Sequence, residues 1–261
     1  MFDNKILRLL ADRVMHAQDH ACTMAQLTDD YPSLSIEDGY AIQAELRRRW
    51  IARGDRLVGL KAGLTSKAKM QQMGVNVPTF GLLMASMARP ENGAIEIDQL
   101  VHPRVEAEIA FVLKDELQGD DCTLAQVMAA TEYVIPAVEV IDSRYEKFKF
   151  DLVSVVADNT SSSRYVAGGR PRDPSDLDLR TIGVVIEKNG EIQVLGASAA
   201  VLNHPGNAIV MLVRHLAARG QTLAAGTFVM TGGITEAIPV ERGDSIVARF
   251  QDMGSVSFRF V

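Results

Sequence analysis

Three glutamates stand out because each lies in an otherwise apolar segment of the chain. Glu106 and Glu108 are two residues apart in the run VEAEIAF, and Glu139 lies in the run VIPAVEVID. Residues two apart in a strand project from the same face, so the first two carboxylates would share one environment. Like charges in apolar surroundings are unfavourable unless a cation or a proton neutralises them. The pattern therefore favours a site that requires a counter-charge.

Carboxylate oxygens from two strands are the ligands that Mg²⁺ or Mn²⁺ prefers, with the remaining octahedral positions left for water or substrate. Zinc is disfavoured because no His or Cys accompanies the acids. A second interpretation places Glu106 and Glu108 on the solvated face of an edge strand and pairs Glu139 with an arginine, Arg104 or Arg144. The residue pattern alone leaves both interpretations open.

Lys61 lies near the end of the apolar segment 57–64 and is followed by Thr65 and Ser66. A lysine in this setting would be partly desolvated and could donate a proton or stabilise a developing enolate. A structural ion pair with one of the glutamates is the alternative. Gly63 and the two hydroxyl residues could also present donors to an anion at the start of a following helix.

Two later segments place polar residues or glycines between apolar stretches, residues 156–163 and 230–235. Either could be a carboxylate-binding loop, and either could be an ordinary turn.

The remaining pattern predicts the elements that must position these residues. Apolar spacing near 3.6 predicts helices over residues 4–20 and 36–53, the second with Ser35 as its N-cap, and a short helix over 67–73. Further helices are expected over 123–131 and 204–219. Strands are expected over 57–62, 105–113, 133–141, 181–188, 191–196, 227–231, 245–251 and 255–261, with a hairpin at Asn189-Gly190. We therefore expect an α+β fold, with a mostly helical region over 1–78 that contributes the Lys61 loop, and a mixed-β catalytic region over 79–261.

Composition limits the possible partners and the compartment. The 261 residues carry a net charge of −6 with a pI near 5.4, which gives no electrostatic footprint for nucleic acid. No apolar run approaches the roughly 20 residues of a membrane span, and the N-terminus has a helical pattern rather than that of a signal peptide. The two cysteines lie far apart in the sequence, which suits a reducing compartment. We therefore expect a cytoplasmic protein that contacts neither membrane nor nucleic acid.

Taken together, these segments resemble the fumarylacetoacetate hydrolase superfamily, and within it the hydratase/decarboxylase branch of the meta-cleavage pathways of aromatic degradation. The resemblance runs through almost the whole chain, in VGLKAGLTSKAKMQQMGV, HPRVEAEIAFVL, YVIPAVEVIDSRYEKFKFDLVSVVADN, GASAAVLNHPGNA and GTFVMTGGITEAIPV. It implies a mixed, rolled β structure with an additional N-terminal segment.

The resemblance also implies roles for individual residues. Glu106, Glu108 and Glu139 match the three metal-ligand positions, and Lys61 matches the lysine beside the oxo-acid end of the substrate. Ser161 matches a hydroxyl that approaches the bound carboxylate, and Thr231 and Gly232 match a loop that closes over the site. Leu64 and Thr65 are expected to line the substrate. Arg144 and Arg164 are candidates for orienting the distal carboxylate, on charge type alone.

One position separates two activities within this branch. Hydratases of the branch typically carry an acid after the proline in a run of the type D-x-P-D-[YF]-G, whereas this chain has Thr79 there, in NVPTFG. The resemblance therefore implies metal-dependent decarboxylation of 2-oxo-3-hexenedioate (4-oxalocrotonate) to 2-hydroxypenta-2,4-dienoate and CO₂. The alternatives are the hydratase that uses this product and a non-catalytic partner subunit of that hydratase. A homo-oligomer is also expected, as is a complex with the pathway hydratase.

Overall fold

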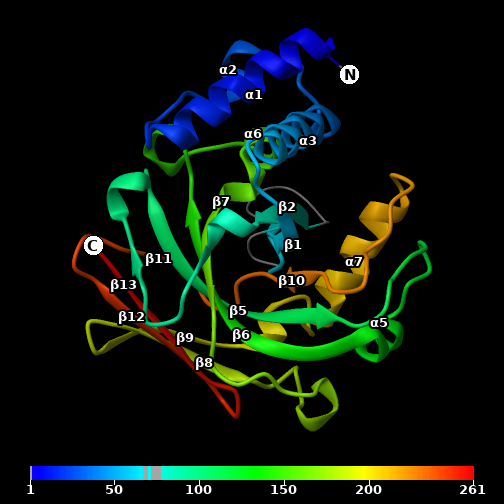
Figure 1. Ribbon diagram of the computed structural model, residues 1–261, viewed down its shortest axis with the longest axis vertical. Coiled ribbons are helices and arrows are strands. Elements are labelled where there is room, and N and C mark those ends of the chain that lie inside the picture. Colours follow the sequence, from blue (N-terminus) through cyan, green and yellow to red (C-terminus); the bar gives the residue numbers. More distant parts are fainter. Residues whose placement is uncertain (1, 67–69, 72–77) are drawn as a thin grey trace.

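The computed structural model describes residues 2–66, 70–71 and 78–261. Figure 1 shows a helical layer above a curled sheet, with a second sheet packed below it. The helices are α1 (Asn4–Asp19), α2 (Leu27–Asp30), α3 (Ile36–Ala52), α5 (Leu124–Ala130), α6 (Leu152–Ala157) and α7 (Gly206–Ala217). Most of the helix predicted over residues 67–73 lies outside the described residues.

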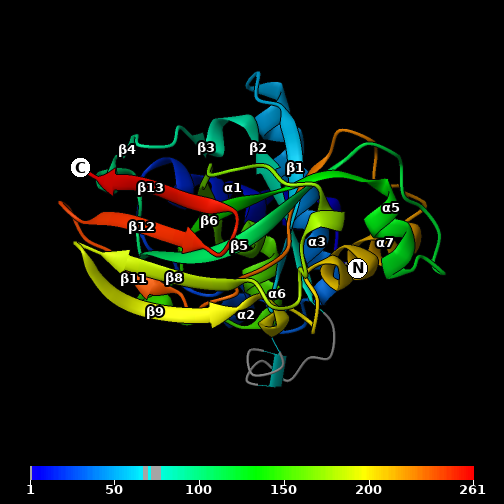
Figure 2. The ribbon, with the colours of Figure 1, turned by 90° about the horizontal axis from the view of Figure 1, so that it is seen from below.

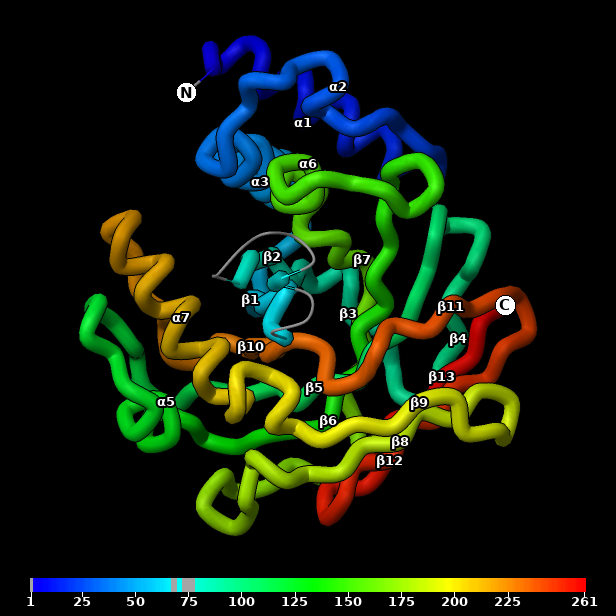
Figure 3. Tube along the Cα trace, turned by 180° about the vertical axis from the view of Figure 1, so that it is seen from behind, coloured from blue at the N-terminus to red at the C-terminus, as the bar shows by residue number. Residues whose placement is uncertain are grey.

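The larger sheet has eight strands and curls around the centre of the molecule. Its order is β2-β1-β10-β5-β6-β7-β3, and β11 pairs with β5. The strands are β1 (Leu57–Gly63), β2 (Thr79–Met84), β3 (Ala88–Arg89), β5 (Pro103–Leu113), β6 (Thr131–Asp142), β7 (Ser162–Ala167), β10 (Phe228–Met230) and β11 (Ile238–Pro239). Figure 3 shows β1 and β2 near the middle of the molecule, beneath α3 and α6.

The smaller sheet has five strands in the order β4-β13-β12-β8-β9. They are β4 (Ala94–Ile95), β8 (Gly183–Lys188), β9 (Glu191–Ala197), β12 (Ser245–Phe250) and β13 (Gly254–Phe260). Figure 2 shows this sheet on the side of the molecule away from α5 and α7. The hairpin between β8 and β9 is confirmed, because Asn189 and Gly190 both have positive φ, 56° and 84°.

Local chemistry explains the helix ends. The Ser35 side chain accepts a hydrogen bond from the Asp38 N–H, and the Asp38 carboxylate accepts one from the Ser35 N–H, which forms a capping box at the start of α3. Thr123 and Gln126 form the same arrangement at α5. Both N-termini agree with the sequence prediction to within a residue.

Three apolar clusters hold these layers together. The largest lies between the two sheets, and includes Ile109, Phe111 and Val138 from the central strands. A second joins α1 and α3 to the segment around Tyr145, and a third fills the region around Met84 and Met230. The α+β expectation with a helical N-terminal region is therefore confirmed. β1 lies in the large sheet although it falls within residues 1–78, so the proposed division at residue 78 stays a prediction.

No helix in the described part of the chain has both the length and the apolar character needed to cross a bilayer.

Candidate metal centre and substrate pocket

The three glutamates meet on the two central strands of the large sheet. In the antiparallel register of β5 and β6, Glu106 lies directly opposite Glu139, and Glu108 lies opposite Ala137. One carboxylate oxygen from each glutamate lies within 4.8 Å of the others. All three residues are buried, with Glu108 and Glu139 at 0% exposure. The interpretation in which Glu106 and Glu108 form the solvated face of an edge strand is therefore wrong.

Burial and mutual repulsion leave this cluster with negative charge that the neighbouring residues do not fully compensate. Burial raises the pKa of Glu108 well above its ordinary range, and the nearby Glu139 and Glu106 raise it further. Burial also raises the pKa of Glu139, although the Lys61 ammonium opposes that shift. Glu108 Oε1 and Glu139 Oε1 are both buried, and neither has a hydrogen-bond partner among the residues that the structure describes. Two buried oxygens without a donor, in a set made only of carboxylates, fit a hard divalent cation such as Mg²⁺ or Mn²⁺.

Lys61 projects from β1 into the same cluster. Its Nζ lies 2.8 Å from Glu139 Oε2 and donates to the Thr160 carbonyl at 3.1 Å, and the side chain is 2% exposed. The neighbouring Gly81 leaves room for it, because a Cβ there would lie 3.1 Å from Lys61 Cγ. The ion pair with a glutamate is thus present, and it places the ammonium beside a candidate metal ligand. A catalytic role for Lys61 stays a prediction.

The loop after β10 packs tightly against the glutamates. The Gly232 N–H donates to Glu108 Oε2 at 2.6 Å, and the Thr231 hydroxyl donates to the Ile109 carbonyl at 2.8 Å. Gly232 has φ +105°, and a Cβ there would lie 2.0 Å from Thr65 Oγ1. Only glycine fits at this position, which brings Thr65 against the Glu108 side of the cluster.

A left-handed turn closes the other side of the cluster. Asn159, Thr160 and Ser161 have φ values of 51°, 54° and 58°, which is a strained conformation for three consecutive residues with side chains. The Asn159 side-chain amide holds the turn on β2, because it accepts from the Leu82 N–H at 2.8 Å and donates to the Leu82 carbonyl at 2.9 Å. The turn presents the Thr160 carbonyl to Lys61.

The Ser161 hydroxyl is buried, and no described residue forms a hydrogen bond with it. It is thus free to bind a ligand beside the cluster. Sequence reasoning singled out Ser161 only by resemblance and missed Asn159. The available signal was the side-chain type, since Asn tolerates positive φ better than other residues do.

Arg144 pairs with Asp158, an acid to which the sequence analysis gave no role. Its Nε donates to Asp158 Oδ1 at 2.7 Å, and its Nη2 donates to the Asp158 carbonyl at 2.9 Å. Burial raises the pKa of Asp158 to about 6, while the Arg144 guanidinium opposes the shift. Neither arginine suggested as a partner pairs with Glu139. Arg144 binds Asp158, and Arg104 lies over the Phe148 ring, 4.1 Å from its centroid. A role for Arg144 at the distal carboxylate stays a prediction.

Comparisons with known proteins agree with this geometry. No protein-family model matches the sequence. The chain is 53% identical over 252 residues to the 4-oxalocrotonate decarboxylase of Pseudomonas sp. (strain CF600), covering 97% of this chain and 96% of that protein. It is 38% identical over 267 residues to the 2-oxo-hept-4-ene-1,7-dioate hydratase of Escherichia coli, covering both chains fully.

Solved structures give the same result. The 4-oxalocrotonate decarboxylase from Pseudomonas putida G7, complexed with magnesium and adipate, superimposes with a TM-score of 0.99 at 50% identity, over 100% of this chain and 99% of that chain. A putative fumarylacetoacetate hydrolase family protein from Yersinia pestis CO92 has a TM-score of 0.59 at 17% identity, over 78% of this chain and 93% of that chain, which shows a shared fold. The chain therefore has the fumarylacetoacetate hydrolase fold and belongs to the family of the 4-oxalocrotonate decarboxylases and their related 2-oxo-acid hydratases.

Proposed function

We propose that this protein catalyses the metal-dependent decarboxylation of 2-oxo-3-hexenedioate to 2-hydroxypenta-2,4-dienoate and CO₂, a carbon–carbon lyase reaction in the meta-cleavage degradation of aromatic compounds. The observation that carries the proposal is the buried cluster of Glu106, Glu108 and Glu139, in which Glu108 Oε1 and Glu139 Oε1 have no donor in the described part of the chain. The 53% identity to a 4-oxalocrotonate decarboxylase supports the substrate.

The reaction breaks the C5–C6 bond, and its electron pair moves through the C3–C4 unit to the C2 oxygen. A Mg²⁺ or Mn²⁺ ion held by the three glutamates would act as a Lewis acid toward the 2-oxo-acid end of the substrate. Lys61 is buried beside Glu139, so its ammonium can stabilise the negative charge that develops on the C2 oxygen and return a proton to it.

The remaining residues position the substrate. The unpartnered Ser161 hydroxyl can donate to the C1 carboxylate. The Gly232 N–H already binds Glu108, so the loop of Thr231 and Gly232 orients a metal ligand and closes that side of the pocket. Thr65 packs against this loop. Leu64 is an apolar, half-buried residue directly after β1, and we assign it to exclude water from the reacting carbons.

Hydration of 2-hydroxypenta-2,4-dienoate is the second candidate, because hydratases of the family share 36–38% identity with this chain. Thr79 argues against it. The Thr79 hydroxyl is buried and has no hydrogen-bond partner within residues 2–66, 70–71 and 78–261. It lies beside Gly63, where an added Cβ would be 3.1 Å from Thr79 Oγ1. A threonine cannot deprotonate water at neutral pH as a carboxylate can, so the position lacks the general base that water addition needs.

The test is to incubate the purified protein with Mg²⁺ and each substrate in turn, and to follow CO₂ release and water addition separately. We expect CO₂ release from 2-oxo-3-hexenedioate, loss of both Mg²⁺ binding and turnover in Glu106→Gln, and retention of both in Glu191→Gln, whose side chain is exposed on β9. Water addition without CO₂ release would identify the hydratase. Absence of both activities would point to the non-catalytic subunit.

We further propose that the protein works in the cytoplasm as a homo-oligomer and associates with the pathway hydratase. Both cysteines are free thiols, which suits a reducing compartment. Ile192 and Leu195 are 65% and 71% exposed on the edge strand β9, and a subunit contact would cover them. Light scattering of the protein alone and of a mixture with the hydratase tests both associations.

A further inference from the structure

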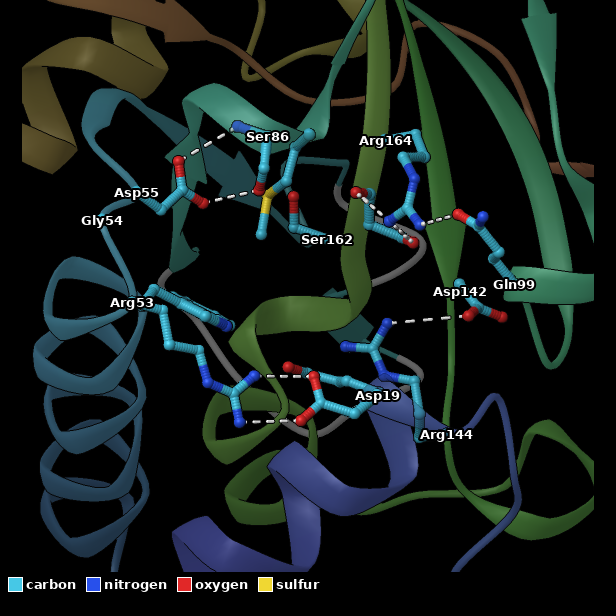
Figure 4. A pocket seen from close by; sticks show the side chains of 14 residues that line it. Asp19, Arg53, Gly54, Asp55, Ser86, Gln99, Asp142, Arg144, Ser162 and Arg164 are labelled. Atoms are coloured by element: carbon cyan, nitrogen blue, oxygen red, sulfur yellow. Dashed lines mark hydrogen bonds and ion pairs between the residues drawn. The ribbon is translucent and has the colours of Figure 1, made fainter.

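A pocket that the glutamate cluster does not line lies between the C-terminal ends of α1 and α3 and the start of β7. Its volume is about 610 Å³, within the range of pockets that bind small molecules. None of the three glutamates lines it, and neither does Lys61. Figure 4 shows Arg164 and Arg144 extending into this pocket from opposite sides. This Arg164 pocket is thus a separate cavity with its own charged groups.

Arg164 has no acidic partner among the residues that the structure describes. Its Nη1 donates to the Ser163 carbonyl at 3.0 Å and to the Ser163 hydroxyl at 3.2 Å, and its Nη2 donates to Gln99 Oε1 at 3.2 Å. Burial, together with the nearby Arg89, lowers the pKa of Arg164 to about 10. A guanidinium that is half-buried without a counter-ion calls for an anion.

None of the three acids that line the Arg164 pocket has a described hydrogen bond or ion pair with Arg164. Asp142 accepts two backbone N–H groups, at 2.9 and 2.6 Å. Asp19 accepts from Arg53 at 2.9 Å, and Asp55 accepts from the Ser86 N–H at 3.1 Å. Arg144 Nη1 lies 3.9 Å from Asp142, too far for a hydrogen bond. In the described part of the chain, none of these acids therefore forms a contact with Arg164, although Asp142 lies near enough to raise its pKa slightly from a distance.

The groups around Arg164 that remain available are donors. Gln99 uses its carbonyl oxygen on Arg164, which leaves its NH₂ group for a ligand, and the Ser163 hydroxyl accepts from Arg164 and so retains its own hydrogen to donate. Trp50 and Met87 add an apolar wall. We propose that this pocket binds a small organic carboxylate, with the carboxylate on Arg164, Gln99 and Ser163 and the carbon chain against Trp50 and Met87.

Trp50 makes the proposal directly measurable, because it is the one tryptophan of the chain and it lines the pocket. Acetate and succinate are titrated into the Mg²⁺-loaded protein while chloride holds the ionic strength constant, and Trp50 emission is recorded. We expect a saturable change with either acid and none with chloride alone. The same titration of Glu106→Gln should give the same curve, which separates this pocket from the proposed metal centre.

Variants locate the binding. Arg164→Gln should weaken binding at least tenfold, since it removes the charged donor, and Arg164→Lys should weaken it less because the charge remains. Arg47→Gln removes one charge from the exposed face of α3 outside this pocket and should bind as the wild type does. Equal binding by wild type and Arg164→Gln would overturn the proposal, as would the absence of a saturable signal. A response to inorganic phosphate but not to either carboxylate would overturn the ligand class.

Discussion

Removal of one charge from the glutamate cluster should have opposite effects with and without metal. We consider Glu108→Gln, because Glu108 is fully buried and the structure describes no donor for one of its oxygens. The amide that replaces it is neutral and still offers an oxygen to the Gly232 N–H. Burial of an uncompensated charge costs several kcal/mol, whereas burial of a partly bonded amide costs roughly 1–3 kcal/mol. We therefore expect the metal-free variant to be more stable than the wild type by about 2 kcal/mol.

The same substitution should remove the increase in the free energy of unfolding that Mg²⁺ binding gives the wild type. Wild-type protein should gain about 2.7 kcal/mol at a Mg²⁺ concentration 100 times the Kd, and the variant should gain little. The order of stability then reverses, with the variant higher in EDTA and lower in excess Mg²⁺. For a chain of this size, 2 kcal/mol corresponds to roughly 4–8 °C in Tm.

The pH dependence gives an independent check. In the metal-free wild type, the pKa of Glu108 is raised in the folded state, so the folded protein binds more protons than the unfolded chain does. Its stability should therefore fall as the pH rises above the ordinary carboxyl range toward the raised folded pKa, and the variant should show a flatter profile.

Thermal unfolding in EDTA and in a Mg²⁺ series, over a range of pH, measures both effects, with Glu191→Gln as the surface control. The reasoning is refuted if Glu108→Gln lowers the metal-free Tm, or if the variant keeps the full Mg²⁺-dependent rise.

Three further predictions concern residues around the site. Lys61→Met should lower kcat about 10²–10⁴-fold and leave Mg²⁺ binding largely unchanged. Steady-state kinetics measures kcat and calorimetry measures Mg²⁺ binding. An unchanged kcat would mean that Lys61 only forms a structural ion pair. Asn159→Ala should lower the free energy of unfolding by about 2–4 kcal/mol, because it leaves the buried N–H and carbonyl of Leu82 unpaired, and urea titration will show whether it does. Burial, with Arg219, lowers the pKa of His215 to about 4, so stability should be lost as the pH falls from 6.5 toward 4. Partial exposure reduces that loss to about 1 kcal/mol, and His215→Phe should remove it from the pH profile.

Local patterns predicted the parts of this structure that local chemistry determines. Ser35 and the apolar spacing after it were enough to place α3, and period-two alternation was enough to place Glu106 and Glu108 on one face of a strand. The partner of Glu139 could not be predicted in the same way. Lys61 is 78 residues away in the sequence, and only the curl of the sheet brings it there.

The strands and turns that were missed have the same explanation. β2 and β7 read as irregular sequence because both faces of each strand are mostly buried, so no alternation marks them. The left-handed turn at 159–161 depends on the grip of Asn159 on the backbone of Leu82, a contact across 77 residues. No local propensity encodes such a contact, and the family resemblance supplied Ser161 in its place.

The facing positions of Glu106 and Glu139 link the cation to the correctness of the fold. A slip of one residue between β5 and β6 would move Glu139 to the opposite face of the sheet and leave Glu106 and Glu108 without the third carboxylate. A misaligned sheet would therefore have no complete set of ligands and would gain nothing from the ion. Metal binding thus stabilises the native register of β5 and β6 relative to registers shifted by one residue, and the ion selects the correctly paired sheet.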